Sequence, residues 1–475
     1  MKPKSRCYLS LNKPGCLWLL LFVFGCGLAQ AAPPQDFSGL LKKLDIVQSR
    51  HNIPAYAVVI SDDNNILLND VRGVALAGSE KPVSPQGYFR IGSITKTFVA
   101  LAALVAERQG KLKLTDKVTN TLGVELFHNP YQKTNPITIA QLLEHSAGFA
   151  DMGRAEFASN DPVTLAQGLK RFAKGRRSLW PAGQFHSYSN TSYGLAGRVL
   201  EVATKTSIND WLGKAVFKPL GMTTATLLQT KTVNDHLVPG YQADGIEAIP
   251  YWHMIYPSLG AINLQPQDMA KLIQLYLKGG VGHLSGSLLQ RQQKPTTTLA
   301  AKQGLEYGYG LGLYQWYRQG QLFYGHGGDA DGYLSRFGFQ KKAGVGYFFV
   351  INTFNNQAKS IMQRIIENFI SAKLEPQTAS KTVGDVDLSA LAGDYDVATQ
   401  RFKRTDRSAA LTLKWSKGQL YIKDSNDQWD VLLHTGNGLF RRTFEPEATT
   451  AIFTANGKTW FSGDEGHFIK RQSEQ

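Results

Sequence analysis

A serine stands three residues before a lysine at the start of an apolar segment of this 475-residue chain. Residues 89–100 read FRIGSITKTFVA, which places Ser93 and Lys96 at that spacing. The segment that follows predicts a helix over residues 94–107, because apolar side chains recur with helical periodicity at Phe98, Leu101, Ala102 and Val105. Residues three apart on a helix are neighbours, with about 5–6 Å between their Cβ atoms. The Lys96 amine can therefore reach the Ser93 hydroxyl, and lysines act as bases where burial or nearby cations lower their pKa.

This spacing alone is a weak signal, because Ser10 and Lys13 share it, and a helix-capping serine with a surface lysine is the alternative interpretation. Two later segments strengthen the catalytic interpretation. Residues 180–190, WPAGQFHSYSN, form a turn that ends in Tyr-x-Asn and precedes a helix predicted over residues 193–204. Residues 323–333, FYGHGGDADGY, form a strand-like run that glycines interrupt.

With these three segments the chain resembles the serine β-lactamase and penicillin-binding-protein superfamily, in particular its branch of class C β-lactamases, DD-peptidases and esterases. The resemblance spans about residues 38–373, and ordered motifs over such a length are a specific signal. It implies an α/β (α+β) catalytic domain with an antiparallel sheet flanked by helices and an all-helical subdomain. Further segments that match the branch in its order are 110–118 (GKLKLTDKV), 137–149 (ITIAQLLEHSAGF), 217–222 (FKPLGM) and 259–263 (LGAIN).

The resemblance also implies roles for the matching residues. Ser93 attacks a carbonyl carbon and forms an acyl-enzyme, which divides a hard hydrolysis into two easier steps. Lys96 and Tyr188 share the proton transfers. Asn190 hydrogen-bonds a substrate amide or orients Lys96. The backbone N–H groups of Ser93 and Asp329 form an oxyanion hole, in which one donor typically contributes ~2.7–4 kcal/mol.

The third motif departs from the β-lactamase pattern of Lys-Thr-Gly or Lys-Ser-Gly, which binds a substrate carboxylate. This chain carries His326, Gly327 and Gly328, followed by Asp329, as its substrate-binding residues. A neutral imidazole is a poorer carboxylate partner than an ammonium group. Gly327 has no hydroxyl, and Asp329 adds a charge of the same sign as the carboxylate. We therefore expect an esterase or a peptidase acting on D-amino-acid substrates rather than an efficient β-lactamase.

Several residues also have ordinary structural interpretations. Tyr188 could be a half-buried aromatic that hydrogen-bonds through its hydroxyl, and His326 could be a turn residue among glycines. The positions of His145 and His186 favour structural rather than catalytic roles for these two side chains. Residues 434–436, HTG, match a third motif by letter, but they stand among short alternating strands and predict a turn.

The start of the chain predicts a cleaved signal peptide and a periplasmic or secreted protein. Basic residues precede an apolar run over residues 17–24, and residues 29–31, AQA, predict cleavage after Ala31. Residues 23–26, VFGC, resemble a lipoprotein box, so lipid anchoring is an alternative. All three cysteines, Cys7, Cys16 and Cys26, lie in this segment, which excludes disulfides and thiolate chemistry from the mature protein.

Composition limits the classes of binding partner that we expect for this protein. The formal net charge is +15, and it falls to +11 without the basic residues Lys2, Lys4, Arg6 and Lys13. No basic tract carries interleaved aromatics, so no nucleic-acid binding is expected, and no apolar run of ~20 residues follows the signal, so no membrane span is expected. A His-x-His-x-Asp cluster is absent, and we expect neither a metal nor another cofactor. The expected partner is a small-molecule or peptide substrate, with peptidoglycan fragments among the candidates.

We expect a catalytic domain over residues 38–374, a linker over 375–387 and a β domain over 388–475, after the signal peptide at 1–31. The domain boundary follows from a change in the hydrophobic pattern, from helical periodicity to a period of two. Apolar and polar side chains alternate in residues 409–415 and 420–422, on either side of the turn at Lys417 and Gly418. Further strand-like runs are 431–433, 439–444 and 451–453. Residues 391–395, LAGDY, resemble the opening of small barrel-like modules appended to this class of enzyme.

The sequence therefore predicts a serine hydrolase that acts through a Ser93 acyl-enzyme on ester or amide bonds, of the esterase, D-amino-acid peptidase or DD-carboxypeptidase type. The alternatives are a β-lactamase and a catalytically idle protein that binds peptidoglycan. An α/β-hydrolase is disfavoured because no Gly-x-Ser-x-Gly elbow occurs.

Overall fold

The computed structural model describes residues 36–372, 374–384, 386–399, 410–423 and 427–472. The predicted signal peptide and its cysteines lie outside these ranges. Among the described residues, no helix combines the length and the apolar character that crossing a bilayer requires.

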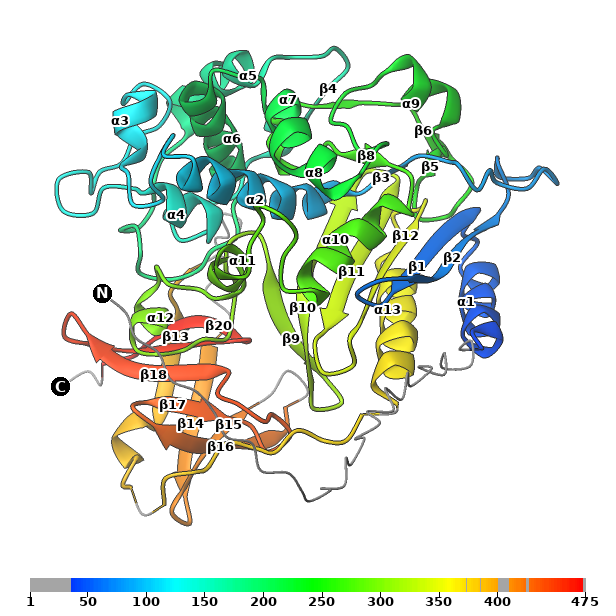
Figure 1. The fold of residues 1–475 in the computed structure, drawn as a ribbon. Helices are drawn as coiled ribbons and strands as arrows, with labels where there is room; N and C mark the ends of the chain where they lie inside the picture. The colour runs from blue at the N-terminus through cyan, green and yellow to red at the C-terminus, as the bar shows by residue number, and fades with distance from the viewer. Residues whose placement is uncertain (1–35, 373, 385, 400–409, 424–426, 473–475) are drawn as a thin grey trace, which may run out of the picture. The chain divides into compact units, whose positions relative to one another are not determined.

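A six-stranded antiparallel sheet forms the centre of the catalytic part (Figure 1). The order β2-β1-β12-β11-β10-β9 places the first strands of the chain beside the last ones of this part. Tyr56 of β1, for example, lies opposite Ile351 of β12. The strands are β1 (Ala55–Ser61), β2 (Ile66–Gly73), β9 (Tyr314–Arg318), β10 (Gln321–Ala330), β11 (Tyr333–Gln340) and β12 (Val345–Ile351).

Both faces of this sheet are covered, and β1 is buried along its whole length. Side chains alternate between faces along a strand. Ala57 and Val59 therefore join the large core shared with the helical subdomain and α10 (Asp268–Leu277). Tyr56, Val58 and Ile60 join a second core with α1 (Ser38–Arg50) and α13 (Asn356–Ser371).

Helices inserted between β2 and β9 form the helical subdomain and its connections (Figure 1). The longest are α2 (Thr95–Arg108) and α6 (Asn190–Thr204). The other helices are α3 (Val118–Leu122), α4 (Ile139–Leu143), α5 (Leu165–Arg171), α7 (Ile208–Leu212), α8 (Lys218–Leu220), α9 (Lys231–His236), α11 (Gly286–Gln293) and α12 (Leu299–Lys302). Single turns of other helix types are η1 (Gly92–Ile94), η2 (Arg154–Glu156), η3 (Ala173–Gly175), η4 (Gly213–Phe217) and η5 (Pro257–Leu259). Short strand pairs join β3 (Phe89–Arg90) to β8 (Asn263–Leu264), β4 (Ala158–Ser159) to β7 (His253–Met254), and β5 (Gly240–Tyr241) to β6 (Ala248–Ile249).

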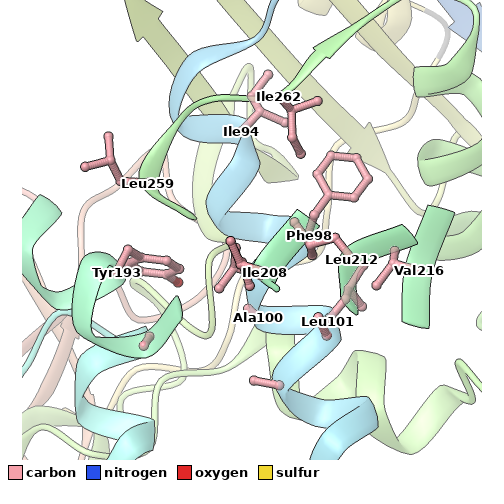
Figure 2. Packing of buried hydrophobic residues seen from close by; sticks show 14 of the residues in the cluster. Ile94, Phe98, Ala100, Leu101, Tyr193, Ile208, Leu212, Val216, Leu259 and Ile262 are labelled. Atoms are coloured by element: carbon pink, nitrogen blue, oxygen red, sulfur yellow. The ribbon is translucent and has the colours of Figure 1, made fainter. Parts of the chain in front are cut away.

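The structure changes the expectation for α2. Periodicity predicted one buried face, but every residue from Thr95 to Ala106 is buried. Figure 2 shows why, since side chains of α6, α7 and η4 pack around the helix together with Leu259 and Ile262. A helix enclosed on all sides needs no polar face, and the small side chains of α2, Ala100 among them, admit these close neighbours.

The C-terminal part is a closed eight-stranded antiparallel barrel in which β13 pairs with β20. The predicted hairpin is confirmed, with Lys417 and Gly418 at positive φ as a tight turn between β14 and β15 requires. The turn predicted at residues 434–436 is wrong. These residues end β16, and the turn follows at Asn437 and Gly438, the residues with positive φ that it needs. The strands are β13 (Gly393–Val397), β14 (Ala410–Ser416), β15 (Gln419–Lys423), β16 (Trp429–Gly436), β17 (Leu439–Arg441), β18 (Thr450–Ala455), β19 (Lys458–Gly463) and β20 (Gly466–Lys470), preceded by the turn η6 (Ser389–Leu391).

The barrel packs on the catalytic part through a shared apolar cluster, and both belong to one compact unit. The rings of Phe185 and Trp460 lie 5.6 Å apart in it. The Tyr307 hydroxyl donates a hydrogen bond of 2.9 Å to Asp464 on the loop between β19 and β20. The barrel thus contacts the turn that precedes Tyr188.

The core around α2 sets the position of Ser93, so it is testable by cavity formation. Phe98 is fully buried and its ring lies 5.5 Å from that of Phe217. We expect Phe98→Ala to lower the free energy of unfolding by about 3–5 kcal/mol, the range for a buried aromatic. Denaturant unfolding measures it, with Phe444→Ala as the control because Phe444 is 58% exposed. Equal, small losses in both variants would contradict the packing described.

Candidate active site

Ser93 lies on the turn η1, and the backbone of β10 is in direct contact with that turn. A Cβ atom added to Gly92, which has a φ of +55°, would lie 2.7 Å from the Asp329 nitrogen. One added to Gly328 would lie 1.9 Å from the Ile91 carbonyl oxygen. Only glycine permits these approaches. They bring the Asp329 backbone beside the nucleophile's turn, where the predicted oxyanion hole needs it.

The amine of Lys96 is completely buried and surrounded by oxygen atoms. It donates hydrogen bonds to Ser93 Oγ at 2.9 Å, Asn190 Oδ1 at 2.7 Å and the Leu259 carbonyl oxygen at 2.7 Å. The lysine therefore holds Ser93, the first residue of α6 and the segment before β8 in a single arrangement. A buried ammonium group requires such partners.

Asn190 is oriented by a residue that the sequence did not single out. Asp151 accepts one hydrogen bond from the Asn190 backbone at 2.7 Å and one from its side-chain nitrogen at 3.2 Å. The Asn190 amide oxygen consequently faces Lys96. This geometry agrees with orientation of Lys96, one of the two roles expected for Asn190. The helix α6 begins at Asn190, three residues before the start that the sequence predicted.

Tyr188 lies between this lysine and a cluster of rings. Lys96 Nζ is 5.1 Å from the centroid of the Tyr188 ring. On the other side, the ring of His145 lies 4.2 Å away and that of Tyr309 6.2 Å away. His145 also accepts a hydrogen bond of 3.0 Å from the Ser189 backbone, so it fixes the Tyr188 segment from behind, as a structural role implies. The structure thus brings Ser93, Lys96, Tyr188 and Asn190 into one site, although they come from two distant segments.

His326 is part of a strand and faces inward, and it is not a turn residue. It is 2% exposed, and burial together with the charge of Lys96 holds its pKa well below the usual value. Its Nδ1 lies 2.5 Å from the Gly327 carbonyl oxygen and must donate there. Its Nε2 then accepts from the Tyr309 hydroxyl at 2.8 Å. Both ring nitrogens of a neutral imidazole are occupied within the protein.

Two cations that local sequence did not reveal lie beside the third motif. Lys359 of α13 forms an ion pair with Asp329, which offsets the like charge expected there. Arg336 of β11 donates to the Tyr314 hydroxyl and stacks 3.9 Å from the Trp316 ring. A Cβ atom on Gly327 would lie within 3.3–3.7 Å of Tyr314, Arg336 and Lys359. No spacing pattern signals these residues, because they come from separate elements.

Comparisons with known proteins identify the family of this chain. The model of the Beta-lactamase family matches residues 37–367, well over half of the chain. The chain belongs to that family. Penicillin-binding protein 4 of Amycolatopsis lactamdurans is 24% identical over 320 residues, which cover 64% of this chain and 81% of that protein.

Solved structures of the beta-lactamase superfamily share the fold. The octameric penicillin-binding protein homologue from Pyrococcus abyssi aligns with a TM-score of 0.61 at 19% identity, over 92% of this chain and 100% of that one. The class C beta lactamase from Rhodobacter sphaeroides aligns with a TM-score of 0.56 at 18% identity, over 70% of this chain and 99% of that one. The beta-lactamase family member described here is accordingly a serine hydrolase of the acyl-enzyme type.

A cavity of about 480 Å³ adjoins the beta-lactamase-family site and has a wall from the barrel. Tyr188 and Tyr309 line one side, and Asp464 and His467 line the other. Burial raises the pKa of Asp464 to about 6 and lowers that of His467 to about 3, so the imidazole is neutral at pH 7. No lysine or arginine is among the described residues that line this cavity.

The first test of the site removes the nucleophile. We expect Ser93→Ala to abolish hydrolysis and labelling by a fluorophosphonate probe while leaving the protein folded, because it deletes one hydroxyl and opens no large cavity. Mass spectrometry of the probe adduct measures the labelling. The control is Ser84→Ala, at an exposed serine outside the site. Undiminished labelling of Ser93→Ala would remove Ser93 from the mechanism.

The second test concerns proton transfer. We expect Lys96→Ala and Tyr188→Phe each to slow acylation by roughly 10²–10⁴, the usual contribution of general acid–base catalysis. Stopped-flow acylation kinetics give the rates. Tyr193→Phe is the matched control, since the Tyr193 ring also lies near Lys96 but its hydroxyl donates to the Leu143 carbonyl. Near-normal rates for both site variants would place the proton path elsewhere.

Proposed function

We propose that this serine hydrolase cleaves esters, and amides of D-amino acids, whose scissile bond has no carboxylate beside it. One observation carries the proposal, namely the neutral and internally bonded His326 at the position where β-lactamases of this branch present a lysine. The proposal also places the enzyme in the periplasm or outside the cell, where peptidoglycan-derived substrates occur.

The proposed reaction has two stages. Ser93 Oγ attacks the carbonyl carbon as its proton passes to Tyr188 in its phenolate form beside the Lys96 ammonium group, and the backbone N–H groups of Ser93 and Asp329 receive the developing oxyanion. The proton then moves to the leaving group, and the acyl group stays on Ser93. In the second stage a water molecule, deprotonated by the same groups, releases the acid and restores the serine.

The polar groups around the third motif support the selection against carboxylates. His326 can offer a substrate neither charge nor a spare N–H. Lys359 is engaged by Asp329, and Arg336 by Tyr314. The adjoining cavity presents the carboxyl group of Asp464, and the described residues that line it include no lysine or arginine. A substrate carboxylate would therefore lose its hydration without gaining an ammonium partner.

Asp464 favours the second substrate class, D-amino-acid amides with a free amino group. A carboxylate on the cavity wall can pair with an ammonium group of the substrate. A DD-carboxypeptidase substrate ends in a carboxylate next to the scissile bond and fits this surface less well. The D configuration follows from the superfamily resemblance.

A substrate panel tests the proposal. We expect higher kcat/KM for short acyl 4-nitrophenyl esters and D-amino-acid 4-nitroanilides than for a chromogenic cephalosporin, with L-amino-acid anilides as the control. Measurements at pH 7 suffice, because burial and the charge of Lys96 hold the pKa of His326 well below its usual value and leave the imidazole neutral there. A preference for the cephalosporin would identify a β-lactamase, and the absence of both Ser93 labelling and turnover would identify an idle binding protein.

A double variant tests the third motif itself. We expect His326→Lys with Asp329→Ser to raise cephalosporin kcat/KM relative to the best ester by about ten-fold or more, because one charge-assisted hydrogen bond contributes roughly 1.5–3 kcal/mol. The same panel measures the ratio. Asp331→Ser, two residues further along, is the control. An unchanged ratio in a folded double variant would mean that the third motif does not set carboxylate selectivity.

A further inference from the structure

A buried arginine next to the nucleophile's turn takes no part in the chemistry described above. Arg90 is on β3, three residues before Ser93, and is 2% exposed. Its strand pairs with β8, where Asn263 is its partner. The side chain is one of the largest fully buried ones of the described residues.

The guanidinium group of Arg90 has no polar partner among the described residues. None of them accepts a hydrogen bond from it or lies within ion-pair distance, and its Nε is buried without an acceptor. Its contacts are aromatic, with the Trp252 ring 4.0 Å and the Tyr251 ring 4.7 Å from its central carbon. Burial lowers the pKa of Arg90, and Tyr251, Tyr333 and Asp331 raise it by less and only through space. Buried charges of this kind are normally paired.

Arg90 lines a second cavity, of about 510 Å³, which is distinct from the one beside the barrel. Other hydrogen-bonding side chains on its wall are Gln229, Thr230, Tyr251 and His253. None of the described residues that line it carries a carboxylate. The cavity therefore combines an unpaired cation, neutral donors and enough space for a small group.

The cavity touches the catalytic segment from behind. Its wall includes Pro257 and Ala261, and between them Leu259 supplies the carbonyl oxygen that receives Lys96. A Cβ atom on Gly260 would lie 3.3 Å from the carbonyl carbon of Gly92. Whatever occupies the cavity thus lies against the segment that holds the lysine.

We propose that this cavity is an oxyanion-binding site in which Arg90 binds a phosphate or carboxylate group. The planar guanidinium matches two oxygens of such a group, and its contacts with the Trp252 and Tyr251 rings hold the fork in place. His253 supports the assignment, because burial and the charge of Arg90 lower its pKa and leave it a neutral N–H donor at pH 7. The chemistry is common to a free anion and to an anionic substituent on the acyl part of a substrate.

Isothermal titration with inorganic phosphate tests the site, since binding needs no enzymatic turnover. We expect saturable binding to the wild-type protein and at least a ten-fold loss of affinity in Arg90→Met, which keeps the stacking but removes the charge. Ten-fold corresponds to about 1.4 kcal/mol. The matched control is Arg198→Met, because Arg198 is paired with Glu201 outside the cavity. If Arg90→Met does not fold, Arg90→Lys replaces it, with the same expected loss because the fork is gone.

Two results would overturn the proposal, namely no saturable phosphate binding to the wild type, or equal binding to the wild type and the folded Arg90 variant. A second arm separates the two sources of the anion by comparing 4-nitrophenyl butyrate with mono-4-nitrophenyl succinate. The site binds an acyl substituent if phosphate competes with the succinate ester and if the wild type prefers this ester to the butyrate while the Arg90 variant does not. Phosphate binding that leaves both esters' KM unchanged assigns it to a free anion.

Discussion

The burial of the Lys96 amine is the constraint on which the rest of the site depends. An ammonium group removed from water must be surrounded by oxygens, and here these come from Ser93, Asn190 and the Leu259 carbonyl. The three acceptors belong to the turn before α2, the start of α6 and the segment before β8. One desolvated charge therefore ties three separate elements together. The packing that encloses α2 keeps Lys96 out of contact with solvent.

A second constraint is the contact between backbones at the nucleophile. Gly92 and Gly328 allow the turn and β10 to approach to distances that a side chain would forbid. The Ser335 hydroxyl donates to the Ile91 carbonyl at 2.9 Å and holds the same junction from β11. The sheet thus brings the Asp329 backbone to the site, and the helical subdomain brings the side chains of Lys96, Tyr188 and Asn190.

The barrel extends this arrangement by closing one side of the catalytic cavity. Phe185 and Trp460 attach it through apolar packing, and Asp464 and His467 then face the cavity. A domain held by a hydrophobic contact can in this way contribute polar groups to substrate selection without any part in the chemical steps. Arg90, in contrast, lies only three residues before Ser93 in the sequence, yet it lines a separate cavity.

From the sequence alone, spacing singled out the Ser93 and Lys96 pair, and the resemblance that the three ordered motifs carry implied the family and the fold class. Ser93 and Lys96 are three residues apart, and helix geometry makes such residues neighbours. Tyr188 and Asn190 followed from the resemblance, and the β hairpin at Lys417 followed from its alternating pattern and turn residues. The predicted turn at residues 434–436 failed because the positive-φ residues that form it are Asn437 and Gly438.

Only the tertiary structure decided what surrounds these residues. Asp151 lies 39 positions before Asn190, and Lys359 lies 30 positions after Asp329, with no periodic pattern to connect either pair. The occupied imidazole of His326 depends on Tyr309 from another segment, and the isolation of Arg90 depends on rings and a cavity wall from several loops. Hydrogen bonding and desolvation depend on distance in space, whereas spacing along the chain reports only local neighbours. That is why the sequence identified the candidate site residues and the fold decided their partners.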